Sequence, residues 1–245
     1  MKKILLGSVA AMALATSANS ADLPQKVFTK APLTRPDSSW TGFYLFGGGG
    51  YGLWAADQQV DPGLLPMDPL RTGGRGYFGT IGGGYDLQFS SSWVAGIFAD
   101  AQFGSMQGTY NASMMVGATA SPKNTLNYAA GGRIGYLIAP NALSYVNAGY
   151  SYAEFSGSTL SSPNVPMSFP TAKFNLDGWF VGGGVEHSLD IFGLSLPGLF
   201  MKTEYRLAEY GHKNVIITDG PFAGPLGTFK PYVQTVSTSL VYRFN

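Results

Sequence analysis

The sequence predicts an all-β protein, an eight-stranded antiparallel up-and-down transmembrane β-barrel. Three observations lead to this prediction: an export signal at the N-terminus, a period of two from Trp40 onward, and connections that alternate between short and long. A period of two is typical of strands, whereas helices repeat every 3.6 residues. Short turns on one side and long loops on the other are typical of outer-membrane barrels.

Residues 1–20 are predicted to form a cleavable signal peptide. Two lysines precede an apolar run over residues 4–15, and Ala18 and Ser20 fit the small-residue rule for cleavage after residue 20. The alternative is an uncleaved anchor, but the apolar run is shorter than the roughly 20 residues that a membrane-spanning helix needs. Together with the barrel pattern, the signal predicts export to the cell outer membrane of a Gram-negative bacterium.

The composition excludes several classes of protein. The absence of cysteine excludes a disulfide scaffold and thiolate metal sites. The formal net charge of +1 gives no indication of a nucleic-acid partner. Charged residues make up only 12% of the chain, while glycine and aromatic residues are common, a mixture that fits a surface facing lipid.

The chain divides into three predicted parts: the signal peptide, a tail and a barrel. Residues 21–39 contain several prolines and lack periodicity, which predicts a proline-rich periplasmic tail that is poorly ordered or loosely attached. The alternative is that this tail enters the lumen as a plug. Residues 40–245 are predicted to form the outer-membrane β-barrel.

The eight predicted strands cover residues 40–53, 75–89, 92–104, 126–138, 143–155, 174–189, 199–210 and 231–244. Four connections are long and rich in Gly, Pro, Ser, Asn and Asp, and we expect them to be loops: 54–74, 104–125, 156–173 and 211–230. An even number of strands places both termini on the side of the short turns.

Apolar residues of an outer-membrane barrel point into lipid. This rule places Trp93, Ile97 and Phe103 outside, Asp100 inside, and Leu189 on the outer face of its predicted strand. Aromatic residues near strand ends are expected to form two girdles at the membrane interfaces. The first comprises Phe89, Trp93, Tyr136, Tyr242 and Phe244, and the second comprises Tyr51, Phe103, Tyr128, Tyr152 and Trp179. The alternative, a soluble barrel with its faces exchanged, would expose these aromatic stripes to water.

Three glycine runs resemble phosphate-binding loops at first sight: 47–50, 82–84 and 182–184. A phosphate-binding loop opens a helix, and no helical pattern follows any of these runs. The interior of an eight-stranded barrel is just wide enough for side chains. The glycines are therefore predicted to leave room for the inward-pointing rings of Tyr44, Phe46, Phe98 and Phe180.

The same alternation places eight charged side chains in the lumen: Asp86, Asp100, Arg133, Glu186, Lys202, Glu204, Arg206 and Arg243. Four acids and four bases form a balanced set, whereas a selective pore more often carries rings of one sign. We therefore expect a charged network that closes the lumen, with the pairs Asp100–Arg133 and Glu186–Lys202 at matching heights. The alternative is that water screens these groups and no fixed network forms.

The sequence contains no convincing catalytic or metal site. In Glu186-His187-Ser188, consecutive strand residues point to opposite faces, so no triad forms and we predict no enzyme. The other histidine, His212, lies far along the chain, which makes a poor metal pair. No cofactor is predicted. Haem binding by the loops is kept as an alternative, through a set of soft ligands: Met106, Met114, Met115, Met167 and His212.

Several short sequence motifs resemble those of a known family: Trp40 to Leu45 (WTGFYL), Gly84 to Phe89 (GYDLQF), Gly183 to Glu186 (GGVE), Ala21 to Pro24 (ADLP) with Lys30 to Pro32, and Leu240 to Phe244 (LVYRF). In this order the chain resembles the RopB-like small outer-membrane proteins of alphaproteobacteria, known as porin-family or immunogenic outer-membrane proteins. The resemblance implies an eight-stranded barrel with structural roles in the envelope. Some members of that family are said to bind haem.

Two departures from that family matter. Outer-membrane barrels usually end in an aromatic residue that the barrel-assembly machinery reads, but here Asn245 follows Phe244, and we expect Phe244 to carry the assembly signal. His187 stands where the family usually has an aromatic residue.

The predicted function is an outer-membrane structural protein with a surface-interaction role. The alternatives are a small-solute porin and ligand binding by the loops. The expected partners are outer-membrane lipid, lipopolysaccharide and the assembly machinery; no oligomeric state is predicted.

Overall fold

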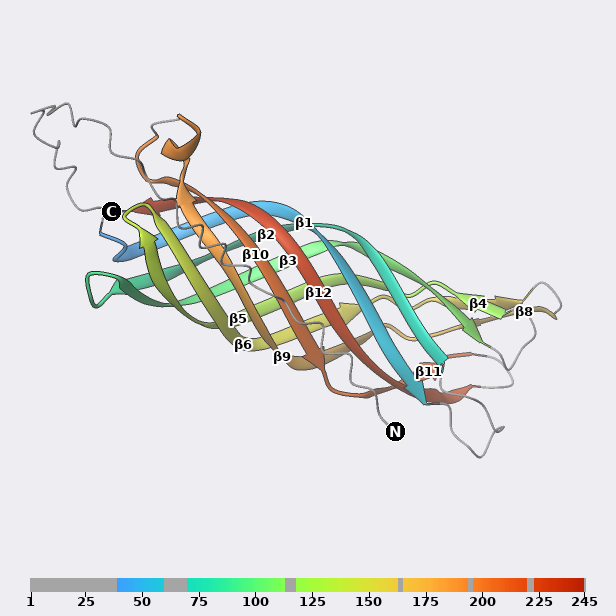
Figure 1. Ribbon diagram of the computed structural model, residues 1–245. Coiled ribbons are helices and arrows are strands. Elements are labelled where there is room, and N and C mark those ends of the chain that lie inside the picture. Colours follow the sequence, from blue (N-terminus) through green and yellow to red (C-terminus); the bar gives the residue numbers. More distant parts are fainter. Residues whose placement is uncertain are drawn as a thin grey trace, which may run out of the picture. The chain divides into compact units, whose positions relative to one another are not determined.

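The computed structural model describes residues 39–59, 70–112, 118–162, 165–193, 196–219 and 223–244, and nearly all of them lie in strands (Figure 1). The strands are β1 (Gly42–Gln59), β2 (Leu70–Gln88), β3 (Trp93–Ala112), β4 (Ala118–Ala120), β5 (Lys123–Ala139), β6 (Ala142–Phe155), β7 (Thr159–Ser162), β8 (Val165–Pro170), β9 (Phe174–Ser188), β10 (Leu199–Tyr210), β11 (Lys213–Ile217) and β12 (Gly224–Phe244). The one helical element among the described residues is the short 3-10 helix η1 (Leu189–Phe192).

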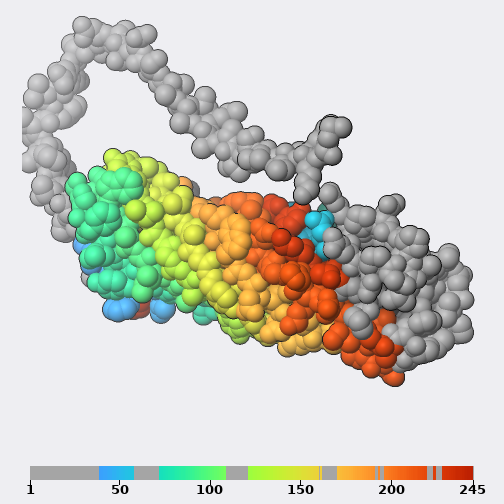
Figure 2. Space-filling view, turned by 90° about the horizontal axis from the view of Figure 1, so that it is seen from below, coloured from blue at the N-terminus to red at the C-terminus, as the bar shows by residue number. Residues whose placement is uncertain are grey.

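Eight strands form a closed antiparallel ring. The order is β2-β1-β12-β10-β9-β6-β5-β3, and β3 pairs back with β2 to close the barrel. Apart from β1 and β12, the first and last strands, neighbours in this ring are consecutive long strands along the chain, so the colours change in sequence across one face of the barrel in Figure 2. The predicted eight-stranded up-and-down barrel is therefore confirmed.

The four short strands continue the long ones. The pair Tyr210↔Gly178 belongs to β10 and β9. The bridge Thr171↔Ile217 lies seven residues after Tyr210 and seven residues before Gly178, so it keeps the same antiparallel register. β11 therefore prolongs β10. In the same way β7 and β8 prolong the β6–β9 hairpin, and β4 prolongs β5 along β3. The barrel is thus made of eight long, locally interrupted strands.

These continuations correct one prediction. The connections 54–74, 104–125, 156–173 and 211–230, predicted as loops, contain strand over most of their described length. The 21 residues of β12 would rise about 50 Å at a tilt near 40°. A membrane strand needs only about 9–11 residues, so roughly half of such a strand extends beyond the bilayer.

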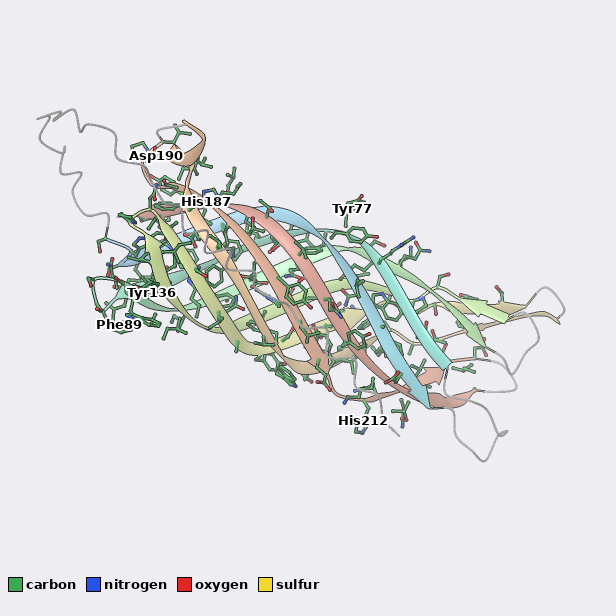
Figure 3. All side chains as sticks on the ribbon, viewed as in Figure 1. Tyr77, Phe89, Tyr136, His187, Asp190 and His212 are labelled. Atoms are coloured by element: carbon green, nitrogen blue, oxygen red, sulfur yellow. The ribbon has the colours of Figure 1, made fainter. Side chains whose placement is uncertain are left out.

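The predicted lipid face is confirmed over the membrane-spanning half. Ile97 and Phe103 are exposed on β3, whereas Asp100 is buried, and Tyr77 projects from the outside of β2 (Figure 3). Phe89 and Tyr136 lie at the short-turn end, where one girdle was predicted (Figure 3). The prediction that Leu189 lies on the outer face of a strand was wrong. Leu189 lies in η1, beyond the end of β9, and its side chain is buried.

Beyond the second girdle the polarity of the two faces is reversed. The inner face becomes apolar, with the buried side chains Trp54, Ala56, Met106, Phe155, Leu176, Val215, Phe229 and Val233. The outer face becomes mostly polar, with the exposed or half-exposed side chains Asp57, Arg75, Gln107, Glu154, Lys173, Asn175, Asp177 and Lys230. This is the pattern of a water-soluble barrel, and it explains why the described side chains within 54–74 and 104–125 do not show the lipid-facing pattern.

Inward-facing glycines make room for aromatic rings in the narrow barrel, as predicted. A methyl group on Gly84 would lie 2.6 Å from the Tyr44 hydroxyl, and one on Gly82 would lie 2.5 Å from the Phe46 ring. Both rings are buried. Within the described part of the chain, no helix has the length and apolar character that crossing a bilayer would require.

Candidate functional site: the barrel interior

The lower ionic cluster lies near the short-turn end and consists of the buried side chains Asp86, Arg133, Glu186 and Arg243. Arg133 Nη1 lies 3.0 Å from Glu186 Oε2, and its Nε lies 2.9 Å from Asp86 Oδ1. Arg243 Nη2 lies 2.8 Å from Asp86 Oδ2 and 2.7 Å from Glu186 Oε1. Each base therefore contacts both acids, and each acid contacts both bases.

The strands of origin explain this closed arrangement. The four residues come from β2, β12, β9 and β5, which are alternate strands of the ring, so acid and base alternate around the lumen. A buried charge costs several kcal/mol unless it is paired, and here every charge has two partners of opposite sign. The cluster is neutral and spans the lumen.

Aromatic rings enclose the lower ionic cluster. The guanidinium carbon of Arg133 lies 4.4 Å from the centroid of the Tyr44 ring, and that of Arg243 lies 4.4 Å from the Trp40 ring. Trp40 precedes β1, and its indole N–H donates to the Pro140 carbonyl oxygen at 3.4 Å, across the short-turn end of the barrel. Its own carbonyl accepts from Arg243 Nη1. These contacts hold Trp40 at the short-turn end of the barrel, next to the lower ionic cluster.

The upper ionic cluster consists of Asp100, Lys202, Glu204 and Arg206, all buried. Arg206 binds Asp100 with two nitrogens, at 3.0 and 2.7 Å, and its Nη2 also lies 2.8 Å from Glu204 Oε1. Lys202 Nζ lies 3.8 Å from Glu204 Oε2 and 3.3 Å from the centroid of the Phe46 ring. The bidentate contact between Arg206 and Asp100 belongs to the stronger class of ion pair.

Both ion pairs predicted from the sequence were wrong. Arg133 binds Asp86 and Glu186, while Asp100 binds Arg206. Glu186 and Lys202 are opposite one another in the β9–β10 register, but their ion-pair partners are Arg133 and Arg243 for the acid and Glu204 for the base. Heights counted from the turns ignore the stagger between tilted strands, which changes the residues that meet across the lumen.

A glycine permits the Arg133–Asp86 contact. Arg133 is opposite Gly96 on β3, and Gly96 is opposite Asp86 on β2, so the two charged side chains meet over the glycine. A methyl group at Gly96 would lie 2.1 Å from Asp86 Oδ1. The sequence signal was present, because Gly96 interrupts the row of large inward residues on its strand between Val94 and Phe98.

An aromatic cluster lies beyond the upper ionic cluster, toward the long-hairpin end. It consists of Trp54, Phe155, Phe174 and Phe229, from β1, β6, β9 and β12. Ring centroids of Trp54 and Phe155 are 5.6 Å apart, and those of Phe155 and Phe229 are 5.5 Å apart. The Trp54 indole N–H donates to the Met106 carbonyl oxygen at 2.8 Å, so its one polar group is satisfied.

Among the described residues, those considered for catalysis and for haem are not brought together. His187 lies at the short-turn end and His212 at the opposite end of the barrel (Figure 3). Ser188 is buried and its hydroxyl contacts Asn141, whereas His187 is half-buried on the other face. Met106, considered as a loop ligand of haem, is instead part of β3 and is buried against the lumen. Residues 114 and 115 and the side chain of Met167 lie outside the described residues.

Acidic, histidine and cysteine side chains do not gather into a group of three that would hold a metal ion anywhere in the described ranges. The predicted assembly residue Phe244 ends β12 with its ring exposed on the outer face, 5.0 Å from the ring of Tyr242. Asn245 lies outside the described residues, as do residues 1–38, which contain the predicted signal peptide and most of the predicted tail.

A closed eight-stranded barrel with an apolar, aromatic-rimmed outer face and a side-chain-filled interior defines a class: the small integral β-barrels of bacterial outer membranes. The model of the outer membrane protein beta-barrel domain family matches residues 5–244, and the chain belongs to this family. The protein is therefore located in the outer membrane of a Gram-negative bacterium.

The chain is similar to the 31 kDa outer-membrane immunogenic proteins of Brucella melitensis and Brucella suis. Each is 25% identical over 252 residues, and the match covers 100% of both chains. Among solved structures, the outer membrane protein OprG from Pseudomonas aeruginosa matches with a TM-score of 0.51 and 10% identity. That match covers 85% of this chain and 99% of OprG, and it shows the fold alone.

Proposed function

We propose that this protein is a structural component of the outer membrane whose lumen is closed to solutes and whose extracellular half is a rigid surface for interaction with other molecules. One observation carries the proposal: the interior is filled by three successive layers, the lower ionic cluster, the upper ionic cluster and the aromatic cluster. Each layer joins side chains from different parts of the ring.

The charge pattern supports a closed lumen over a pore. A selective pore favours binding that is strong enough for an ion to enter and weak enough for it to leave, commonly through rings of one sign. Here each ionic cluster contains two acids and two bases that contact one another. Opening a path requires breaking contacts between buried charges, which costs several kcal/mol for each ion left without a partner.

The extracellular half supports the interaction role. Its strands continue beyond the second girdle with a buried apolar core and a polar outer face, so the barrel wall stays ordered outside the bilayer. Two exposed ion pairs lie on this outer face: Lys173 Nζ lies 2.8 Å from Glu154 Oε2, and Lys230 Nζ lies 2.8 Å from Glu209 Oε1. The hydrogen bond to Glu154 raises the pKa of Lys173, and this exposed pair contributes little to stability.

The proposal includes no enzymatic activity, because His187 and Ser188 point to different faces. It includes no haem site, because Met106 is buried and the two histidines lie at opposite ends of the barrel. A small-solute pore and a loop ligand remain the competing functions to be tested.

The test is a deletion strain complemented with defined variants. We expect the deletion to increase sensitivity to detergent with EDTA, and the wild-type gene to restore resistance. A variant that combines Trp54→Ala and Phe229→Ala with Arg133→Met and Arg206→Met, and so disrupts all three layers, should restore less resistance to small antibiotics. Tyr232→Ala, on the exposed outer face of the same strand as Phe229, is the matched control. Unchanged resistance in the deletion strain would contradict the envelope role.

A further inference from the structure

A small polar cavity lies inside the barrel, next to the upper ionic cluster. Its volume is about 10 Å³, and it is lined by nine residues. Six of these carry polar side chains: Gln102, Asn127, Ser151, Arg206, Tyr210 and Thr235. Ala208 and Val233, which pack with the apolar core, line it as well. The cavity is therefore placed where the ionic layer meets the apolar layer.

Two side chains at this cavity point to a ligand. Gln102 and Thr235 are only 6% and 5% exposed, and neither side chain makes a hydrogen bond within the described residues; their polar atoms are not fully buried, and both side chains line the cavity. A buried polar group without a partner is costly, and most such groups in proteins are satisfied by protein or by ordered water. Both side chains line the cavity, so a ligand placed there would lie next to them.

The other polar side chains that line the cavity are held in place by hydrogen bonds within the protein. The hydroxyls of Ser151 and Tyr210 are 2.8 Å apart and hydrogen-bonded to one another. Asn127 exchanges two hydrogen bonds with Asn124. Arg206 has five N–H groups, and its bonds to Asp100 and Glu204 use four of them. One N–H of Arg206 Nη1 is left to donate.

The size and charge of the site select the ligand. A cavity of this volume has room for about one water. An anion would accept from Arg206, but Asp100 and Glu204 already neutralise that base, so the anion would be desolvated without a counter-charge. Water both donates and accepts, which suits an Arg206 N–H, an amide and a hydroxyl together.

We propose that this cavity is a binding site for one ordered water, held by Arg206, Gln102 and Thr235. The water connects the upper ionic cluster to the polar residues beneath the aromatic cluster, and it satisfies the side chains that the protein itself leaves without partners. The site does not depend on whether the lumen conducts.

The test is a crystal structure of the folded protein at a resolution that shows ordered water, from crystals grown with bromide as the main anion. We expect a peak at this cavity within hydrogen-bond distance of Arg206 Nη1 and of Gln102 or Thr235, without anomalous signal. A cavity without density would overturn the proposal, and so would an anomalous bromide peak, which would identify an anion.

Substitutions test which side chains hold the proposed water. Thr235→Val keeps the shape of the side chain and removes its hydroxyl, and Gln102→Met removes the amide; together they should abolish the water peak. Thr238→Val, on the exposed outer face of the same strand, should leave it unchanged. Should the double variant fail to fold, Thr235→Val alone should lower the occupancy of the peak. An undiminished peak in the folded variants would contradict the assigned partners.

Discussion

Arg133 is the side chain whose loss should destabilise the barrel interior most clearly. It contacts Asp86 and Glu186 in the lower ionic cluster. Without Arg133, Arg243 is the one base of this cluster that still contacts the two acids. Arg133→Met keeps an apolar stem and removes the charge. One buried negative charge is then uncompensated, which should cost about 3–5 kcal/mol in the free energy of unfolding.

The pairing itself is tested by double-mutant cycles. The contacts predict that Asp86→Asn and Arg133→Met are coupled by roughly 1.5–3 kcal/mol, because each removes the other's partner. Asp100→Asn should add to Arg133→Met within about 0.5 kcal/mol, because Asp100 binds Arg206 instead. The assay is reversible urea unfolding in lipid vesicles. Additive effects for Asp86 and Arg133 would refute the proposed cluster.

Three further predictions concern the fold and its assembly. Gly84→Ala should lower the free energy of unfolding by about 1–3 kcal/mol, because the added methyl would lie 2.3 Å from a backbone oxygen. Gly47→Ala, whose methyl would have nothing nearer than 3.9 Å, should be nearly neutral. Equal effects of the two variants in urea unfolding would contradict this. Phe244→Ala should reduce the outer-membrane yield on an immunoblot far more than deletion of Asn245, and a wild-type yield for Phe244→Ala would disprove the assembly role. Residues 21–39 should be cleaved by protease in the folded, detergent-solubilised protein, and full protection would favour the plug.

The membrane-spanning half of the fold could be predicted because two solvents act on one strand. Lipid requires apolar residues outside, and a narrow lumen requires polar or ring-shaped residues inside, so a period of two is visible in residues such as Trp93 to Phe103. The predicted strand 199–210 agrees with β10 at both ends. The inward positions of the lumen charges followed from the same alternation.

The extracellular half was missed because the alternation is inverted there. Trp54 and Ala56 point inward and Asp57 is exposed, an arrangement that a search for lipid-facing residues reads as a loop. The signal was nevertheless present, since apolar residues at every second position with polar residues between them, as in Phe174 and Leu176 around Asn175, are typical of a soluble strand. The aromatic cluster was missed for the same reason.

The partners of the charges could not be predicted from the sequence. Pairing across a lumen depends on strand tilt and stagger, which bring together residues at different distances from their turns. Arg133 meets Asp86 only because Gly96 leaves space between their strands. A list of inward charges therefore identifies the members of a network, but not its contacts.

The most direct test of the closed lumen is single-channel conductance of the purified, folded protein in planar lipid bilayers, with heat-modifiable gel mobility as proof of folding. We predict no steady conductance for the wild-type protein. The Trp54→Ala/Phe229→Ala variant should stay closed as well, because both ionic clusters still span the lumen, and openings are expected only when Arg133→Met and Arg206→Met are added. Large, steady openings of the wild-type protein would contradict the account and identify it as a pore.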